Sequence, residues 1–195
     1  MNLAKQGLQA YEASHSNNNG SSAHSQAHAS RPNFNHDEVV QTATQHGSGY
    51  SDMFSQAMQH VNNNTHAHEE PIDQAHVVAS HQEVYQNGNA SSLSAGSMGS
   101  AAALETFQKF AGGGASGGGS KSQLISMAMA EASKLFDKSG GAASGSKQDA
   151  INGAGMMVMK MLVQSKMSGG GGGGSGGSSQ HGGMGDLMSL ASKFL

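Results

Sequence analysis

The clearest helical pattern in the chain follows Ser51. Four apolar residues recur there at i, i+3, i+4 and i+7 spacing, which places them on one face of an α-helix: Phe54, Ala57, Met58 and Val61. Ser51 is a residue type that favours the N-terminal cap of a helix, so we expect the helix to begin beside it.

Two further short helices are predicted on either side of this one. Residues 37–46 carry apolar positions on one side, at Val39, Val40 and Ala43. Proline is tolerated in a first helical turn, so a helix is expected to start at Pro71. Its apolar face would hold Ile72, Ala75, Val78 and Tyr85. Each helix is near or below the roughly 12–15 residues that an isolated helix needs, so all three must pack on other parts of the chain.

Polar, low-complexity sequence surrounds these helices. Residues 14–30 contain Ser, Asn, His and Ala but no large apolar side chain, so burial cannot offset the entropy lost on ordering. We therefore expect a short N-terminal helix over residues 1–13 and a disordered linker over residues 14–35. Residues 62–68 are expected to form another loop.

The second half of the chain repeats one helical pattern. A lysine flanked by apolar or small residues recurs in it, at Lys109, Lys134, Lys160 and Lys193. Glycine-rich segments separate the units at 112–119, 140–145 and 169–177. Ser146 and Asp149 have the spacing of a helix N-terminal capping box. The pattern predicts four similar helices, although any amphipathic helices bounded by glycine and serine resemble one another.

The four helices are expected to pack as one cluster. Their apolar stripes would supply its core, at Phe107, Phe110, Leu124, Ala128, Leu135, Val158, Met161, Leu162, Leu187, Leu190 and Phe194. The lysines would lie at the rim, with their stems packed and their ammonium groups in water.

These patterns divide the chain into successive regions. They comprise a small helical region (36–87), a linker (88–96), a helical repeat region with glycine-rich connectors (97–168), a glycine-rich linker (169–183) and a C-terminal amphipathic helix (184–195). The predicted fold is mostly α, a loose bundle of short amphipathic helices joined by Gly/Ser-rich and His/Asn-rich disordered segments.

Composition changes the expected character of the core. Leu, Ile, Val and Phe together make up 27 of the 195 residues, which is below the roughly 20% at which a chain fills a core easily. The 13 methionines make up part of the deficit, so we expect a methionine-rich core.

Composition also argues against several classes of protein. The chain has no cysteine, which excludes disulfides, cysteine-ligated zinc and a thiol nucleophile. No apolar run is long enough to cross a membrane, and the first 14 residues lack the apolar core of a secretory signal. We therefore expect a cytoplasmic or nuclear protein.

Charge and motifs favour neither nucleic-acid binding nor catalysis. Residues 91–195 hold 8 basic and 5 acidic residues, an excess too small for a nucleic-acid interface. The chain contains neither G-x-S-x-G nor H-E-x-x-H, and its carboxylates are sparse and scattered. We expect no catalytic residues and no cofactor.

Histidines provide the candidate metal site. Ten of the 11 histidines precede residue 82, and imidazole suits zinc, copper and nickel. Asp73, His76 and His81 lie on or near one predicted helix and are the candidate ligands. In the alternative interpretation, histidine substitutes for Gln and Asn in a polar low-complexity region.

Methionines suggest a second metal hypothesis, copper. Met157, Met159 and Met161 alternate, and thioether sulfur favours Cu(I). In a helix, residues i and i+2 point about 200° apart, and the surrounding apolar residues have helical spacing. This favours methionine as core filler or as an adaptable binding face.

The C-terminal segment allows a membrane-surface hypothesis. It has a wide apolar stripe, formed by Leu187, Met188, Leu190, Ala191, Phe194 and Leu195. Interfacial helices usually carry a strongly basic polar face, and this one has only Lys193, balanced by Asp186. Core packing is therefore favoured over membrane contact.

Several blocks, in matching order, resemble an uncharacterised family of fungal proteins labelled "beta-flanking protein". The blocks are residues 51–57 (SDMFSQA), 80–85 (SHQEVY), 97–103 (SMGSAAA), 123–137 (QLISMAMAEASKLFD), 147–151 (KQDAI) and 190–195 (LASKFL). Together with the glycine-rich spacers of variable length between them, the blocks span most of residues 36–195. The resemblance implies a fungal source and supplies no activity.

The sequence favours a non-catalytic helical scaffold or protein-interaction protein. Its helices would pack together, associate with another copy, or receive a helix of a protein partner in a methionine-rich groove. A His-rich metal-binding or buffering protein is one alternative, and a peripheral membrane-surface protein is another.

Overall fold

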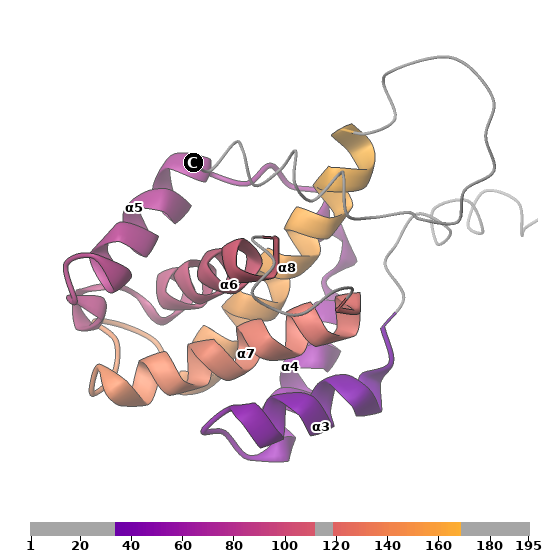
Figure 1. The fold of residues 1–195 in the computed structure, drawn as a ribbon, viewed down its shortest axis with the longest axis horizontal. Coiled ribbons are helices and arrows are strands. Elements are labelled where there is room, and N and C mark those ends of the chain that lie inside the picture. Colours follow the sequence, from indigo (N-terminus) through magenta and orange to yellow (C-terminus); the bar gives the residue numbers. More distant parts are fainter. Residues whose placement is uncertain (1–33, 112–118, 169–195) are drawn as a thin grey trace, which may run out of the picture. The chain divides into compact units, whose positions relative to one another are not determined.

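The structure is a computed structural model that describes residues 34–111 and 119–168 (Figure 1). In these residues it contains six α-helices and two short 3-10 helices, so the mostly α prediction is confirmed. The predictions for the N-terminal helix (1–13), most of the linker (14–35), the Gly-rich linker (169–183) and the C-terminal helix (184–195) lie outside the described residues.

The buried faces of the first two helices follow the sequence pattern closely, although Tyr50 and not Ser51 occupies the cap position of the second helix. Helix α3 (His36–His46) is capped by Asn35, whose side chain accepts a hydrogen bond from the Glu38 N–H, and it buries Val39 and Ala43. Helix α4 (Ser51–Asn63) buries all four residues of the predicted face, Phe54, Ala57, Met58 and Val61. Their i, i+3, i+4, i+7 spacing therefore identified the buried face correctly.

Helix α5 (Gln74–Tyr85) differs from the prediction at its start and in its buried face. Pro71 precedes the helix, and Asp73 is the cap because its carboxylate accepts a hydrogen bond from the His76 N–H at 3.0 Å. The predicted face was only partly correct. Ile72, Val78 and Tyr85 are partly buried against the core, but Ala75 is exposed. The buried residues are Val77, Ser80 and Val84. Apolar residues lie all around this short helix, so its packing against α6 decides which face is buried.

The stretches predicted as a loop and a linker contain short helices. Helix α4 continues to Asn63, and the 3-10 helix η1 (Thr65–His68) follows it and packs against α8. His68 is only 2% exposed, so this polar stretch forms part of the packed structure. The predicted 88–96 linker contains the 3-10 helix η2 (Ala90–Ser92), and the next helix begins at Ala95.

Three longer helices form the centre of the fold: α6 (Ala95–Ala111), α7 (Lys121–Lys138) and α8 (Lys147–Ser168). Each packs against the other two (Figure 1). All the predicted core positions that fall in the described residues are buried, namely Phe107, Phe110, Leu124, Ala128, Leu135, Val158, Met161 and Leu162. The packing of three of the four lysine-centred helices is therefore confirmed; the fourth lies outside the described residues.

Small residues let α6 and α8 approach each other closely. A Cβ atom on Gly99 would lie 2.2 Å from the Ala150 carbonyl oxygen and 2.7 Å from the Ala154 nitrogen. On the other side, a Cβ on Gly153 would lie 3.0 Å from the carbonyl oxygen of Gly96. Because the two backbones are in direct contact, any side chain at Gly99 would force them apart.

The connection between α7 and α8 contains the predicted capping box and the glycine-rich segment that was expected to separate the two helices. Gly140, with φ of +71°, follows α7 in a conformation that glycine adopts easily. The Ser146 N–H donates to the Asp149 carboxylate at 2.8 Å, and the Asp149 N–H donates back to the Ser146 hydroxyl oxygen at 3.3 Å. This reciprocal pair confirms the capping box.

The helices from the two halves of the sequence share one hydrophobic core. Helix α3 packs against α7, α4 against α8, and α5 against α6. Met58, Met98, Met129 and Met161 are at most 1% exposed, so the core is methionine-rich as predicted. Met157 and Met159 are buried with Met161 in α8, which agrees with the core-filler interpretation of this run.

Candidate functional site

Two adjacent hollows on the surface of α7 form the candidate site. The first has a volume of about 320 Å³ and is lined by His46, Thr106, Lys109, Phe110, Met127, Ala130, Glu131 and Lys134. The second, of about 530 Å³, is lined by Val84, Tyr85, Gly88, Ala90, Glu131, Lys134, Leu135, Lys138 and Ser139. Glu131 and Lys134 line both, so the hollows share one wall. We call the pair the double hollow.

The first hollow has an apolar floor. Phe110 on α6 and Ala130 on α7 are 7% and 2% exposed, and Met127 adds a flexible thioether side chain. The Thr106 hydroxyl donates to the Ala102 carbonyl oxygen at 2.8 Å, so its polar group is already satisfied. The floor therefore suits an apolar group.

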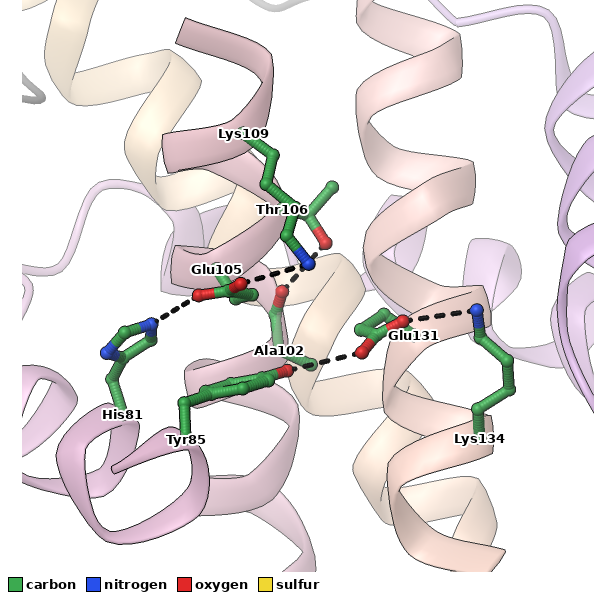
Figure 2. Close-up of polar contacts among 8 residues, drawn as sticks. All are labelled: His81, Tyr85, Ala102, Glu105, Thr106, Lys109, Glu131 and Lys134. Carbon is green, nitrogen blue, oxygen red and sulfur yellow. Dashed lines mark hydrogen bonds and ion pairs between the residues drawn. The ribbon is translucent and has the colours of Figure 1, made fainter. Parts of the chain in front are cut away.

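A polar network between α5 and α6 lies beside the first hollow (Figure 2). The Glu105 carboxylate lies 2.7 Å from Nε2 of His81 on α5 and 2.9 Å from Nζ of Lys109. Burial acts to raise the pKa of Glu105, but the hydrogen bonds from His81 and Lys109 outweigh it and hold the pKa below its ordinary value. Glu105 is therefore ionised at neutral pH and links α5 to α6.

A second network forms the wall between the two hollows (Figure 2). The Glu131 carboxylate pairs with Nζ of Lys134 at 3.2 Å and accepts a long hydrogen bond of 3.5 Å from the Tyr85 hydroxyl. Burial raises the pKa of Tyr85 far above its ordinary value, and the charges of Glu131 and Glu105 raise it further. Tyr85 is thus a neutral donor, and it links α5 to α7.

In each of the two networks, the carboxylate is held in place by its partners. Both carboxylates are already engaged by a cation and by a second polar group, which leaves neither as an uncompensated base. The lysines keep much of their surface in water, since the side chains of Lys109 and Lys134 are 66% and 49% exposed. The arrangement presents an apolar floor between exposed ammonium groups.

The metal candidates each have another partner. Asp73 caps α5, Nε2 of His76 lies 3.0 Å from the Ser97 hydroxyl, and Nε2 of His81 contacts Glu105. Within residues 34–111 and 119–168, no group of three or more His, Asp or Glu side chains is placed to hold a metal ion. His81 is therefore the one residue of the three that belongs to the candidate site, through Glu105.

Sequence reasoning missed most of the double hollow. Lys109 and Lys134 were singled out by their recurrence, but as rim residues of a bundle. Tyr85 was assigned only to the apolar face of its helix, and Glu105 and Glu131 were two of the scattered carboxylates. The three residues lie on different helices, so their relation depends on how those helices pack.

The fold defines an α-helical protein with a core that spans both halves of the described sequence and with the double hollow on its surface. Residues 35–115 match a family described as "Domain of unknown function (DUF7721)". No curated protein and no solved structure matches the chain. The matched segment runs from α3 through α6 and stops before α7 and α8, so it contains only part of the shared core.

A helix that crosses a bilayer must be both long and predominantly apolar. Among the helices of the described residues, none is both long enough and apolar enough to cross a bilayer. The C-terminal stripe proposed for membrane-surface contact lies outside the described residues.

Proposed function

We propose that this protein is a non-catalytic helical interaction protein that binds a segment of a partner protein in the double hollow. The observation that carries the proposal is the adjacency of the two hollows, which share Glu131 and Lys134 as a common wall. Two neighbouring depressions can accept two successive side chains of one bound segment, which is how helix-in-groove recognition operates.

The lining of the first hollow supports this use. Its floor contains an aromatic ring, a methionine and an alanine, and methionine is common on surfaces that adapt to a partner. The polar networks fix α5, α6 and α7 relative to one another before a partner arrives, so little ordering entropy is lost on binding.

The test is to fill the first hollow and compare binding. Ala130→Leu adds a larger side chain at the floor, and Ala75→Leu makes the same change at an exposed position on α5. Proteins captured from an extract of the source cells would be quantified for the wild type and both variants, and each candidate partner would then be purified and titrated.

We expect at least one purified partner to lose affinity for Ala130→Leu and to bind wild type and Ala75→Leu equally. Thermal denaturation establishes that both variants are folded. Partners that bind all three proteins alike would contradict the assignment of this surface. Saturable, stoichiometric binding of zinc or copper in calorimetry, with no such partner, would favour the metal-binding alternative instead.

A further inference from the structure

Resting on the proposed function, we infer that the segment bound in the double hollow is an acidic amphipathic helix. Its apolar side chains would enter the two hollows, and its carboxylates would face a row of lysines along them. The inference depends on which charges the surface presents and on how they are spaced.

Three lysines line the double hollow. Lys109 lies on α6 beside the first hollow, Lys134 lies in the shared wall, and Lys138 lies beside the second. Lys134 and Lys138 are four residues apart on α7, which places them on the same face of the helix. The row therefore extends along both hollows.

The acidic residues at this surface are already compensated, whereas the lysines have donors to spare. Among the described residues, Glu131 is the one acidic side chain that lines either hollow, and it is held by Lys134 and Tyr85. Glu105, beside the first hollow, is held by His81 and Lys109. An ammonium group has three donors, and in the described part of the chain Lys138 forms no salt bridge. The surface thus favours an anionic partner.

The two hollows favour a helix over other anionic partners. The first hollow has an apolar floor, and the second has Val84, Ala90 and Leu135 among its polar and charged lining residues. Because the hollows lie next to each other, a segment that fills both presents apolar groups at a short repeat on one side. An amphipathic helix does so at i, i+3 or i+4 and i+7. A membrane surface offers acidic headgroups without such fixed apolar anchors, so vesicle binding is treated below as a result that would overturn the inference.

The test is a selection from a displayed library of peptides with helical patterning and randomised polar positions. The full chain is the bait, and selected peptides are re-measured by fluorescence anisotropy against wild type and Ala130→Leu. Peptides whose affinity falls for Ala130→Leu define binding at the double hollow. We expect these peptides to be enriched in Asp and Glu next to Leu, Met or Phe.

Charge variants then test the lysine row. In the double variant Lys134→Gln with Lys138→Gln, the selected peptide should bind about 2- to 30-fold more weakly, the range for two ion pairs at a solvated rim. Lys121→Gln, on the same helix but outside both hollows, should bind as wild type does. Replacing the acids of the peptide by Gln should mimic the double variant, and raising the salt concentration should weaken only the acidic peptide.

The possible results separate this inference from the proposed function. Hollow-dependent peptides without acidic enrichment would overturn the acidic partner and leave the proposed function intact. A selection that yields no peptide sensitive to Ala130→Leu would overturn both. A third result would overturn the inference: no acidic peptide is selected, and the protein binds phosphatidylserine vesicles tightly but loses this binding in the double lysine variant. The lysine row would then bind lipid headgroups.

Discussion

Helices α5 and α8 both pack on α6, but they are held by different forces. Helix α8 contacts α6 backbone to backbone through Gly99 and Gly153 and contributes a continuous set of buried side chains. Helix α5 buries only Val77, Ser80 and Val84, and adds polar contacts to Ser97, Glu105 and Glu131. One face of α6 is thus in close backbone contact with α8, whereas the other holds α5 through buried apolar side chains together with polar contacts at Ser97 and Glu105.

This difference bears on where a binding site can arise. A close-packed backbone contact has no room for an added methyl group, so the α6–α8 contact serves the packing of the fold. On the α5 side, side chains rather than backbones define the surface, and they leave the hollows open beside Tyr85, Glu131 and Lys134. The double hollow lies beside this attachment, where side chains and not backbone contacts line the surface.

The largest expected effect comes from adding one methyl group to the α6–α8 contact. Gly99→Ala places a Cβ 2.2 Å from a main-chain oxygen, so the helices must separate. We expect the free energy of unfolding to fall by about 3 kcal/mol, the upper end for overpacking a core. Urea denaturation followed by circular dichroism measures it.

Gly96→Ala is the matched control on the same helix. A Cβ at Gly96 would meet no atom within 4 Å, so alanine should be tolerated and should stabilise the helix by up to about 1 kcal/mol. Equal destabilisation by both alanines would mean that helix propensity, and not the close approach to α8, controls this contact.

The sequence predicted the parts of the fold that depend on local pattern. The buried face of α4 and the Ser146–Asp149 cap depend on spacing within a few residues, and both were correct. The face of α5 was only partly correct, because Val77 and Val78 are adjacent and no single stripe is dominant. The importance of Gly99 and the position of Glu131 beside Tyr85 depend on contacts between distant segments, so no local pattern could reveal them.

A second comparison truncates one buried valine in each of the two helices that pack on α6. Val158 in α8 is fully buried, and Val77 in α5 is 2% exposed. Val158→Ala leaves a cavity between close-packed helices and should cost about 2 kcal/mol, whereas Val77→Ala should cost about 1 kcal/mol because the lightly attached α5 can move inward. Equal losses in chemical denaturation would show that α5 is packed as rigidly as α8.

The attachment of α5 should also depend on pH through Glu105. Since the pKa of Glu105 is lowered on folding, its ionised form stabilises the folded state. That contribution is complete above the ordinary value of 4.5 and is lost as the pH falls through the lowered value. Glu105→Gln should therefore destabilise the protein by about 1 kcal/mol at pH 7, a value that allows for solvent screening.

The difference between wild type and Glu105→Gln should shrink as the pH falls below 4.5. Denaturation of both proteins across this range measures it, and Lys109→Gln separates the contribution of the lysine from that of His81. A difference that stays constant with pH would show that Glu105 stabilises α5 through packing and not through its charge.

The smallest expected effect concerns the start of α5. Asp73 accepts the His76 N–H at 3.0 Å, and replacement of such a cap by alanine costs about 0.5–2 kcal/mol. Because Asp73 is exposed and α5 lies at the edge of the core, we expect a loss near the lower limit for Asp73→Ala and none for Asp73→Asn, which keeps the acceptor. Melting curves with and without a chelator distinguish this cap from a metal ligand. If Asp73→Asn is as damaging as Asp73→Ala and the chelator lowers the melting temperature of wild type alone, Asp73 acts as a ligand and the histidines of α5 would have to be reconsidered with it.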